Sequence, residues 1–249
     1  MRIYFAGVDR PSFLPILWEN GARNILISYA DYRKSFAKFS EHLSNYQFNI
    51  LLDSGAYSAF TRGIKLDIRE YADFLLEFGD WFEHCFNLDV IGDYEASWEN
   101  QRYLESRGLK PVPVVHYGEE PGLVEQLGKE YDLVALGGMV PMSTRELDEW
   151  LREVFYDADG NLRNLPKLHG LGLTTKSLLK KYRFYSSDST GWLAGKKFGR
   201  IINDTGTSIK VNRENQTDLF SSNLNWYLKM EKEINKSPVK QQTQVITLF

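Results

Sequence analysis

Residues 48–82, FNILLDSGAYSAFTRGIKLDIREYADFLLEFGDWF, contain the unit on which the expected fold is built. The apolar run that ends at Leu52 is typical of a buried strand, and Asp53 follows it in a Ser-Gly-Ala turn. Residues 67–82 then show helical periodicity, and Asp67 is a good N-cap residue. The stretch therefore predicts one strand followed by one helix.

The same unit recurs along the chain. Further helices are expected at 97–108, 120–131 and 143–155, and Ser143 with Glu146 forms a capping-box pattern. Alternation of strands and helices predicts a parallel sheet covered by helices, and eight strand runs favour a closed (β/α)8 TIM barrel over an open doubly wound sheet. The strand runs are RIYFAG, RNILISY, FNILLDSG, EHCFNLDV, KPVPVVHY, DLVALGG, PKLHGLG and RFYSSDST.

The character of the sequence changes after the eighth run. We expect a catalytic barrel domain over residues 1–194 and a C-terminal extension over 195–249. Within the extension, the Gly- and Asn-punctuated region is expected to be extended, and residues 218–236 are expected to form an amphipathic helix that packs on the barrel. Residues 237–249 are interpreted as a tail or a docking strand.

Composition excludes several classes of protein. Apolar residues at 43% and charged residues at 25% are ordinary globular values, which argues against a disordered or fibrous chain. No apolar run approaches the roughly 20 residues of a membrane span, and MRIYFAGV begins a strand rather than a signal peptide. We therefore expect a soluble, cytoplasmic protein. The single cysteine, Cys85, cannot form an internal disulfide or a Cys-rich zinc site, and it is interpreted as a small core residue.

Charge distribution is more informative than the net charge. The formal net charge of −3 gives no overall electrostatic attraction to nucleic acid. Between residues 176 and 200, however, one acid, Asp188, accompanies a cluster of cations: Lys176, Lys180, Lys181, Arg183, Lys196, Lys197 and Arg200.

Polar residues and glycines stand where the predicted strands end. Barrel enzymes place their chemistry at the carboxyl ends of the strands, because the loops that follow the strands converge there. A lone acid is costly in a packed interior, so several acids at one rim imply a polar pocket. The residues at these ends are Asp53, Asp89, His116, Gly137, Gly138, His169 and Asp188.

Structural roles remain open for each of these residues. Asp53 and Asp188 are each suited to capping the helix that follows its strand. His116 is equally compatible with a hydrogen-bonded structural histidine, and the Gly137–Gly138 pair with a tight turn. The large aromatic side chains in the loops are equally compatible with core or rim packing.

Two stretches, LLDSGAYSAF at 51–60 and LHGLGLTTKSLLKKYRFYSSDSTGW at 168–192, carry a resemblance to a known family. They resemble the queuine tRNA-ribosyltransferase (tRNA-guanine transglycosylase) superfamily, and look closest to its short phage-type members associated with placing 7-deazaguanines in DNA. The family's Asp-Ser-Gly-Gly-aromatic signature is similar to residues 53–57. Its Gly-x-Gly strand end with a later aspartate is similar to residues 169–188, and Gly137–Gly138 resembles its base-binding turn. The resemblance covers residues 1–200.

The resemblance implies a base-exchanging transglycosylase, a pentosyltransferase without a cofactor or metal, that replaces guanine by a 7-deazaguanine such as 7-cyano-7-deazaguanine. Asp188 would be the nucleophile that holds the sugar covalently, and Asp53 the general acid/base. The base would be bound by Ser54, Tyr57, Asp89, His116, Gly137, Gly138 and His169, with Tyr57 and His169 stacking on its two faces. DNA is favoured as the polymer over RNA, in a host cytoplasm for a phage protein, and a homodimer or partner protein is implied.

Two acids suit such chemistry on general grounds. Base exchange at a sugar passes through an oxocarbenium-like state, and a carboxylate on each side of the bond serves it. One acid must be ionised while the other carries a proton, which unequal burial at a barrel mouth can arrange.

The chain also departs from the family. It has one cysteine where tRNA-directed members carry a Cys-x-Cys-x-x-Cys zinc site, and STGWLAGKKFGR where they have a Pro-Thr-Arg element. A different nucleic-acid grip is therefore expected, with Lys196, Lys197 and Arg200 neutralising phosphates and Trp192 stacking. A solvated basic face is the structural alternative.

Three other functions remain open at this point. A metal-dependent amidohydrolase would use His116, His169 and Asp188 as ligands, but the first strand lacks the His-x-His pair. An N-glycosidase would use Asp53 and Asp188 with water as the acceptor. A non-catalytic nucleic-acid adaptor would need neither acid.

Overall fold

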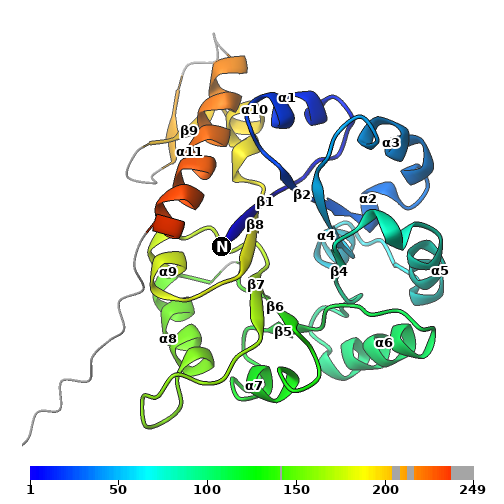
Figure 1. Cartoon of the computed structure of the whole chain (residues 1–249), viewed down its shortest axis with the longest axis vertical. Helices are drawn as coiled ribbons and strands as arrows, with labels where there is room; N and C mark the ends of the chain where they lie inside the picture. The colour runs from blue at the N-terminus through cyan, green and yellow to red at the C-terminus, as the bar shows by residue number, and fades with distance from the viewer. Residues whose placement is uncertain (141, 204–207, 212–215, 237–249) are drawn as a thin grey trace, which may run out of the picture.

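The computed structural model describes residues 1–140, 142–203, 208–211 and 216–236, and eight parallel strands form its central sheet. The sheet order is β4-β3-β2-β1-β8-β7-β6-β5, so the first and eighth strands pair and the sheet curls into a barrel (Figure 1). The strands are β1 (Arg2–Ala6), β2 (Asn24–Ser28), β3 (Asn49–Asp53), β4 (His84–Cys85), β5 (Val114–His116), β6 (Leu133–Gly137), β7 (Lys167–Gly170) and β8 (Ser186–Ser189).

The two edge strands of this sheet meet just beyond β4. Phe86 and Val112 form a parallel bridge there. The Val112 N–H donates to the Cys85 carbonyl at 2.8 Å, and the Asn87 N–H donates to the Val112 carbonyl at 3.0 Å. The predicted (β/α)8 barrel is therefore confirmed.

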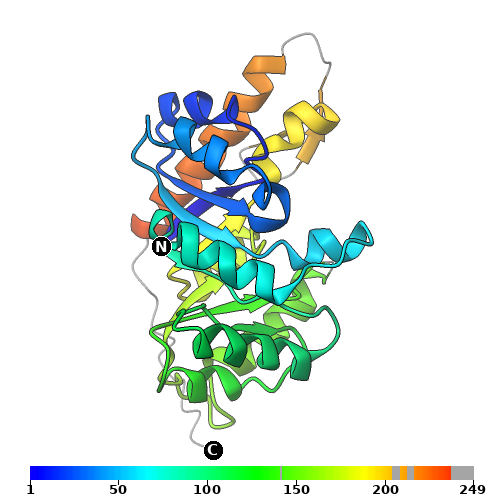
Figure 2. The same cartoon turned by 90° about the vertical axis from the view of Figure 1, so that its right-hand side faces the viewer.

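Helices surround the strands as an outer ring (Figure 1), and α4 projects from the body of the barrel in the turned view (Figure 2). They are α1 (Phe13–Glu19), α2 (Tyr29–Tyr32), α3 (Phe36–Leu43), α4 (Ala56–Thr61), α5 (Ile68–Phe78), α6 (Tyr94–Ser106), α7 (Leu123–Leu127), α8 (Thr144–Phe155), α9 (Lys176–Lys181), α10 (Ala194–Phe198) and α11 (Gln216–Lys236). Short 3-10 turns lie at η1 (Gly79–Trp81) and η2 (Gly191–Leu193).

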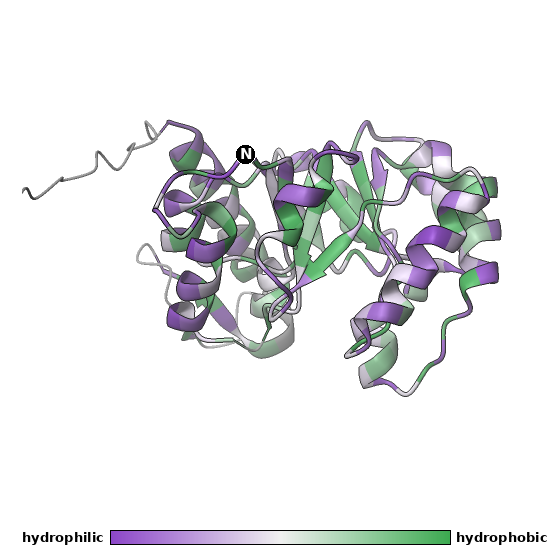
Figure 3. Ribbon diagram, turned by 90° about the horizontal axis from the view of Figure 1, so that it is seen from below, coloured by the Kyte–Doolittle hydropathy of each residue, from purple (hydrophilic) through white to green (hydrophobic). Residues whose placement is uncertain are grey.

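Local sequence accounts for where the longer helices begin. Asp67 caps α5 by accepting from the N–H groups of Arg69 and Glu70. Ser143 and Glu146 form a complete capping box at the start of α8, as the sequence predicts. The apolar faces of the helices pack against the outside of the sheet, while their polar faces turn outward (Figure 3).

A smaller apolar cluster fills the inside of the barrel. Side chains alternate between the two faces of each strand, so the interior cluster is formed by alternate residues. Its fully or nearly buried members are Tyr4, Ala6, Leu26, Leu51, Phe86, Val112, Val114, Leu133 and Ala135. Asp53 follows Leu51 by two residues on the same face of β3. The strand ends above this apolar plug therefore form a separate, more polar layer at the mouth.

The C-terminal region differs in part from its prediction. The segment expected to be extended begins with the helix α10, which ends at Gly199 in a left-handed conformation with φ of 59°. Strands β9 (Arg200–Ile202) and β10 (Ser208–Lys210) then pair antiparallel. Helix α11 buries Phe220, Leu224, Tyr227 and Met230.

The domain boundary drawn at residue 194 stays a prediction, and residues 237–249 lie outside the described residues. Within the part of the chain that the structure describes, no helix is both long and apolar enough to cross a membrane.

Trp192 is a core residue rather than a surface one. Its side chain is fully buried, and its ring makes edge contacts with Phe5, Phe13 and Phe220. Its Nε1–H donates to the carbonyl of Ala6 at 2.7 Å. The ring thus joins the end of β1 to α11.

We predict that Trp192→Ala lowers the free energy of unfolding by about 3–5 kcal/mol, because it empties a large buried volume and leaves the Ala6 carbonyl unpaired. Phe198→Ala is the control, since the Phe198 side chain is 62% exposed; its effect should stay below about 0.5 kcal/mol. Urea denaturation measures both, and equal losses would contradict this account of Trp192.

Candidate active site

The mouth of the barrel brings together acids from three different strands or the loops that follow them. Asp53 ends β3 and lies beside Ser28 in register, while Asp188 lies in β8 beside Tyr4. Asp89 follows β4 and contacts His116 at the end of β5. The charges of Asp188 and Asp89 both act on Asp53, so the three carboxyl groups share one electrostatic environment.

The Ser-Gly turn after Asp53 has a steric origin. Gly55 has a φ of 75°, and a Cβ atom there would come within 2.3 Å of Ser28 Oγ and 2.5 Å of Ala30 Cβ. Its backbone N–H donates to the Asp53 carboxylate. Ser54 is buried, and its hydroxyl accepts from the Ala56 N–H at 3.4 Å. Only glycine fits this turn, which holds Asp53 at the rim.

Asp53 is a carboxylic acid with a raised pKa. Burial raises its pKa from 3.8 to about 7, with smaller contributions from the negative charges of Asp188 and Asp89. In the described part of the chain, no ion pair includes Asp53. Near neutral pH this group can therefore both give and take a proton.

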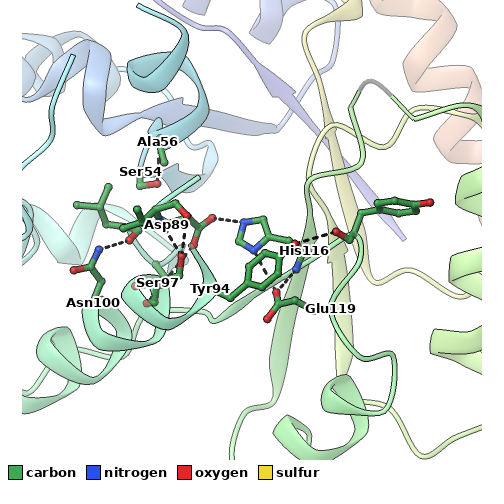
Figure 4. Close-up of polar contacts among 12 residues, drawn as sticks. Ser54, Ala56, Asp89, Tyr94, Ser97, Asn100, His116 and Glu119 are labelled. Atoms are coloured by element: carbon green, nitrogen blue, oxygen red, sulfur yellow. Dashed lines mark hydrogen bonds and ion pairs between the residues drawn. The ribbon is translucent and has the colours of Figure 1, made fainter. Parts of the chain in front are cut away.

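Asp89 is paired with a histidine, as Figure 4 shows. Asp89 Oδ2 lies 3.2 Å from His116 Nε2, and Glu119 Oε2 lies 3.4 Å from His116 Nδ1. Glu119 also accepts the backbone N–H of His116 at 2.7 Å, and the Tyr94 ring stacks on the imidazole at 5.8 Å. Burial alone would lower the pKa of His116, but the two acids outweigh it and raise the pKa to about 9.

The loop that carries Asp89 is fixed by α6. Ser97 Oγ accepts the Val90 N–H at 2.9 Å, and Asn100 donates to the Leu88 carbonyl at 2.7 Å (Figure 4). Burial raises the pKa of Asp89, and its hydrogen bond with His116 opposes that rise. Asp89 and His116 therefore form a charge-balanced pair beside Asp53.

Asp188 is held from two sides. Its Oδ1 atom accepts the backbone N–H of Gly172 at 2.7 Å and lies 3.4 Å from His169 Nε2. His169 is fully buried one layer deeper in the barrel, where its Nδ1 lies 2.8 Å from Ser186 Oγ. Asp188 itself is 8% exposed, so only a small part of this residue faces the mouth.

The remaining predicted binding residues differ in position. Tyr57 lies on α4 and is 56% exposed. At Gly137 the backbone packs closely, since an added Cβ atom would come within 2.9 Å of the Val114 side chain. Gly138 has a φ of 66° and directly follows the end of β6. Binding roles for these residues stay predictions. His169, in contrast, is fully buried between Tyr4 and Phe86, so it is not available to stack on a ligand at the mouth.

Of the four residues predicted to bind nucleic acid, the structure describes the side chains of Trp192 and Arg200. Trp192 is buried, as described above. Arg200 is engaged with Ser208 in the β9–β10 hairpin, through its Nε–H to Oγ at 2.9 Å and a second bond to the carbonyl. Lys196 and Lys197 lie on α10, and their side chains are outside what the structure describes.

The metal-ligand set considered from the sequence is not assembled. His116 faces Asp89 and Glu119, whereas His169 faces Ser186 and Asp188. Over residues 1–140, 142–203, 208–211 and 216–236, no group of three or more His, Cys, Asp or Glu side chains is arranged to hold a metal ion. Cys85 is partly buried against the core, and burial raises the pKa of its thiol to about 12.

Several residues of the site were not found from the sequence. Glu119, Tyr94 and Ser186 were missed, although Glu119 stands three residues after His116, a spacing that could have suggested a contact.

A cavity of about 1260 Å³ lies away from the acids, on the outside of the barrel near α7 and α8. Its lining includes Glu125, Arg152 and Arg163 but none of Asp53, Asp89 and Asp188, so this cavity is separate from the cluster of acids.

Comparison with known proteins gives a fold but no family. No family model matches the chain, and no curated protein matches it. Among solved structures, two variants of the tryptophan synthase alpha subunit from Pyrococcus furiosus are similar. One is 15% identical over 92% of this chain and 97% of its own, with a TM-score of 0.54. The other is 14% identical over 92% and 97%, with a TM-score of 0.52.

The resemblance to the queuine tRNA-ribosyltransferase superfamily is therefore wrong. The two similar structures described above are variants of a tryptophan synthase alpha subunit, and no family model supports the resemblance. The base-exchanging glycosyltransferase, the 7-deazaguanine base and the DNA or RNA partner fall with it, as does the phage host. The geometry agrees with this correction, because His169 and Trp192 are buried and neither can stack on a base.

We predict that Asp53→Asn becomes stabilising relative to the wild type as the pH rises. The folded wild type holds a proton up to about pH 7, whereas the unfolded chain releases it near 3.8, so wild-type stability falls between these values. The amide of the variant does not ionise, so the variant does not lose stability for this reason. Urea denaturation across that pH range should show a difference in the free energy of unfolding that grows by up to about 4 kcal/mol. A constant difference would contradict the raised pKa.

His116→Gln should show the opposite dependence on pH. The pKa of His116 is raised from 6.5 to about 9, so its stabilising contribution is complete below 6.5 and is lost as the pH rises through about 9. The stability advantage of the wild type over His116→Gln should shrink across that interval. His42→Gln, on α3, is the control, and denaturation curves that show the same trend for both variants would contradict the assignment.

Proposed function

We propose that this protein is a lyase that splits a small-molecule substrate by general acid–base catalysis at the mouth of its barrel. Asp53 would carry the proton, and the Asp188 carboxylate would act as its partner base. The observation that carries the proposal is the Asp53 carboxyl, whose pKa of about 7 suits proton transfer near neutral pH.

The site supports proton transfer rather than covalent catalysis by a thiol or a hydroxyl. The Cys85 thiol has its pKa raised to about 12, so it is a poor nucleophile. The Ser186 hydroxyl, although 2.8 Å from a histidine nitrogen, is buried with it below the mouth. What the mouth offers a ligand is a set of carboxyl groups in different environments.

These two acids can divide a bond cleavage between them. Asp188 takes the proton of a substrate hydroxyl, and that O–H electron pair forms a carbonyl as the adjacent carbon–carbon bond breaks. The electron pair of the broken bond passes to the leaving carbon, which takes the proton of Asp53. Return of a proton from Asp188 to Asp53 through water restores the starting state. One substrate thus yields two products without any other reactant.

The neighbouring pair has a supporting role in this scheme. His116 with its raised pKa balances the charge of Asp89, so that the mouth does not hold several uncompensated carboxylates. Tyr57 and Tyr94, which are 56% and 40% exposed, offer ring surface for the apolar part of a substrate. Ser54 and the backbone at Gly137 and Gly138 remain candidates for its polar part.

The fold supports a small-molecule substrate by analogy alone. Active sites of TIM-barrel enzymes lie at the carboxyl ends of the strands, where these acids lie. The two similar structures described above are subunits of a tryptophan synthase, and at 14–15% identity this likeness concerns the fold and not the reaction. A cytoplasmic location, expected from the sequence, is part of the proposal.

A small-molecule extract provides the test. We expect the wild type to deplete one compound and to produce two whose elemental formulae add up to it, as followed by mass spectrometry. In D₂O, one product should gain a carbon-bound deuterium. Asp53→Asn and Asp188→Asn should slow the reaction at least about 100-fold. Asp159→Asn, which changes an exposed acid in the turn after α8, should not slow it.

Other product formulae would contradict the proposal. Products that contain one added water indicate a hydrolase, and a product with the formula of the substrate indicates an isomerase. No change in the extract, or equal activity of all three variants, would show that these acids do not catalyse a lyase reaction.

A further inference from the structure

His169 is a fully buried, ionisable side chain for which the proposed reaction has no direct use. Its ring lies in the interior of the barrel, with Tyr4 at 6.1 Å and Phe86 at 4.9 Å between ring centroids. The two aromatic rings fix the plane of the imidazole. Its two nitrogens therefore have set directions, one toward Ser186 and one toward Asp188.

We propose that His169 is a positioning residue, which donates its Nε2–H to the Asp188 carboxylate while the Ser186 hydroxyl donates to Nδ1. This inference rests on the proposed function for the catalytic role of Asp188. The three residues form a chain of contacts. Ser186 Oγ lies 2.8 Å from His169 Nδ1, and His169 Nε2 lies 3.4 Å from Asp188 Oδ1. This chain of contacts runs from the buried interior to the mouth.

Electrostatics selects this tautomer over the other. With the proton on Nδ1 alone, the lone pair of Nε2 would face the Asp188 carboxylate at 3.4 Å, an arrangement of two acceptors. With the proton on Nε2, the same contact is attractive, and Ser186, which is 1% exposed, gains an acceptor for its hydroxyl hydrogen. A buried donor or acceptor without a partner is costly, and the proposed tautomer gives Nδ1 a donor and directs the Nε2–H at the carboxylate.

The Nε2 contact is longer than a hydrogen bond in the structure as it stands, and Nε2 has no other hydrogen-bond partner among the described residues. Contacts between catalytic groups are often long without a ligand and shorten when one binds. The Gly172 N–H approaches the same oxygen at 2.7 Å. Two donors from below and beside Asp188 would leave its other oxygen free for the substrate.

The tautomer itself is the first test, and it needs no substrate. Nitrogen NMR of the full-length protein with labelled histidine separates the four imidazoles, which His169→Gln helps to assign. We expect His169 to carry its proton on Nε2 near neutral pH, and Ser186→Ala to leave a mixture of tautomers. A proton on Nδ1 alone, with Nε2 unprotonated, would overturn the proposal even if the lyase function holds.

The second test separates positioning from packing. Amide exchange at Gly172 reports how firmly Asp188 is held, and it should speed up about tenfold in His169→Leu. His169→Gln, whose amide can still donate to Asp188, should keep most of the protection. Phe86→Leu alters the packing of the imidazole without removing its nitrogens, and it is the matched control. Equal acceleration in His169→Leu and Phe86→Leu would show that His169 only fills space.

The third test applies to the substrate found in the extract. His169→Leu should lower kcat about tenfold to 100-fold while KM changes little, and His169→Gln should recover most of the loss. An unchanged kcat in His169→Leu would overturn the positioning role. If the extract contains no substrate, the proposed function fails by itself, and the tautomer and exchange measurements still decide the arrangement of His169.

Discussion

The site depends on one unfavourable arrangement, a carboxyl group held in a largely desolvated mouth beside two others. Closure of the barrel brings the ends of β3 and β8 to one rim, so Asp53 and Asp188 interact although they are far apart in sequence. Gly55 fixes the turn that keeps Asp53 there, because no larger residue fits against Ser28 and Ala30. Desolvation and like charge together favour the neutral form of one acid.

Two of the three acids have a histidine beside them. His116 accompanies Asp89, and His169 lies beneath Asp188. Asp53 receives a backbone N–H from Gly55, and burial raises its pKa to about 7. Asp53 therefore differs from the other two acids in having no histidine beside it, and its burial suits it to the role of proton carrier.

Much of the fold follows from local sequence. Alternating apolar runs and capped helices predict the barrel, and the caps at Asp67 and Ser143 form as expected. The rule that chemistry lies at strand ends correctly gathers Asp53, Asp89, His116 and Asp188 at one mouth. The sequence does not show how deep a side chain lies. His169 lies one layer below the rim although a glycine follows it, and Trp192 turns into the core although it follows a Ser-Thr-Gly stretch.

The family resemblance failed for a physical reason. The match at residues 53–57 reflects the demand of a tight turn after a strand, since Gly55 must adopt a positive φ against Ser28. Such a turn satisfies a local steric requirement, and it does not identify a reaction. A partner such as Ser186 becomes visible only when β7 and β8 are brought side by side.

Carboxyl-carbon NMR of the aspartates, with Asp53→Asn to assign the resonance, measures the central claim directly. The account predicts that Asp53 in the wild type titrates near pH 7 and that Asp188→Asn lowers the midpoint by removing a negative charge. A midpoint near the ordinary value of 3.8 would contradict it, because Asp53 would then be a solvated carboxylate without a proton to transfer.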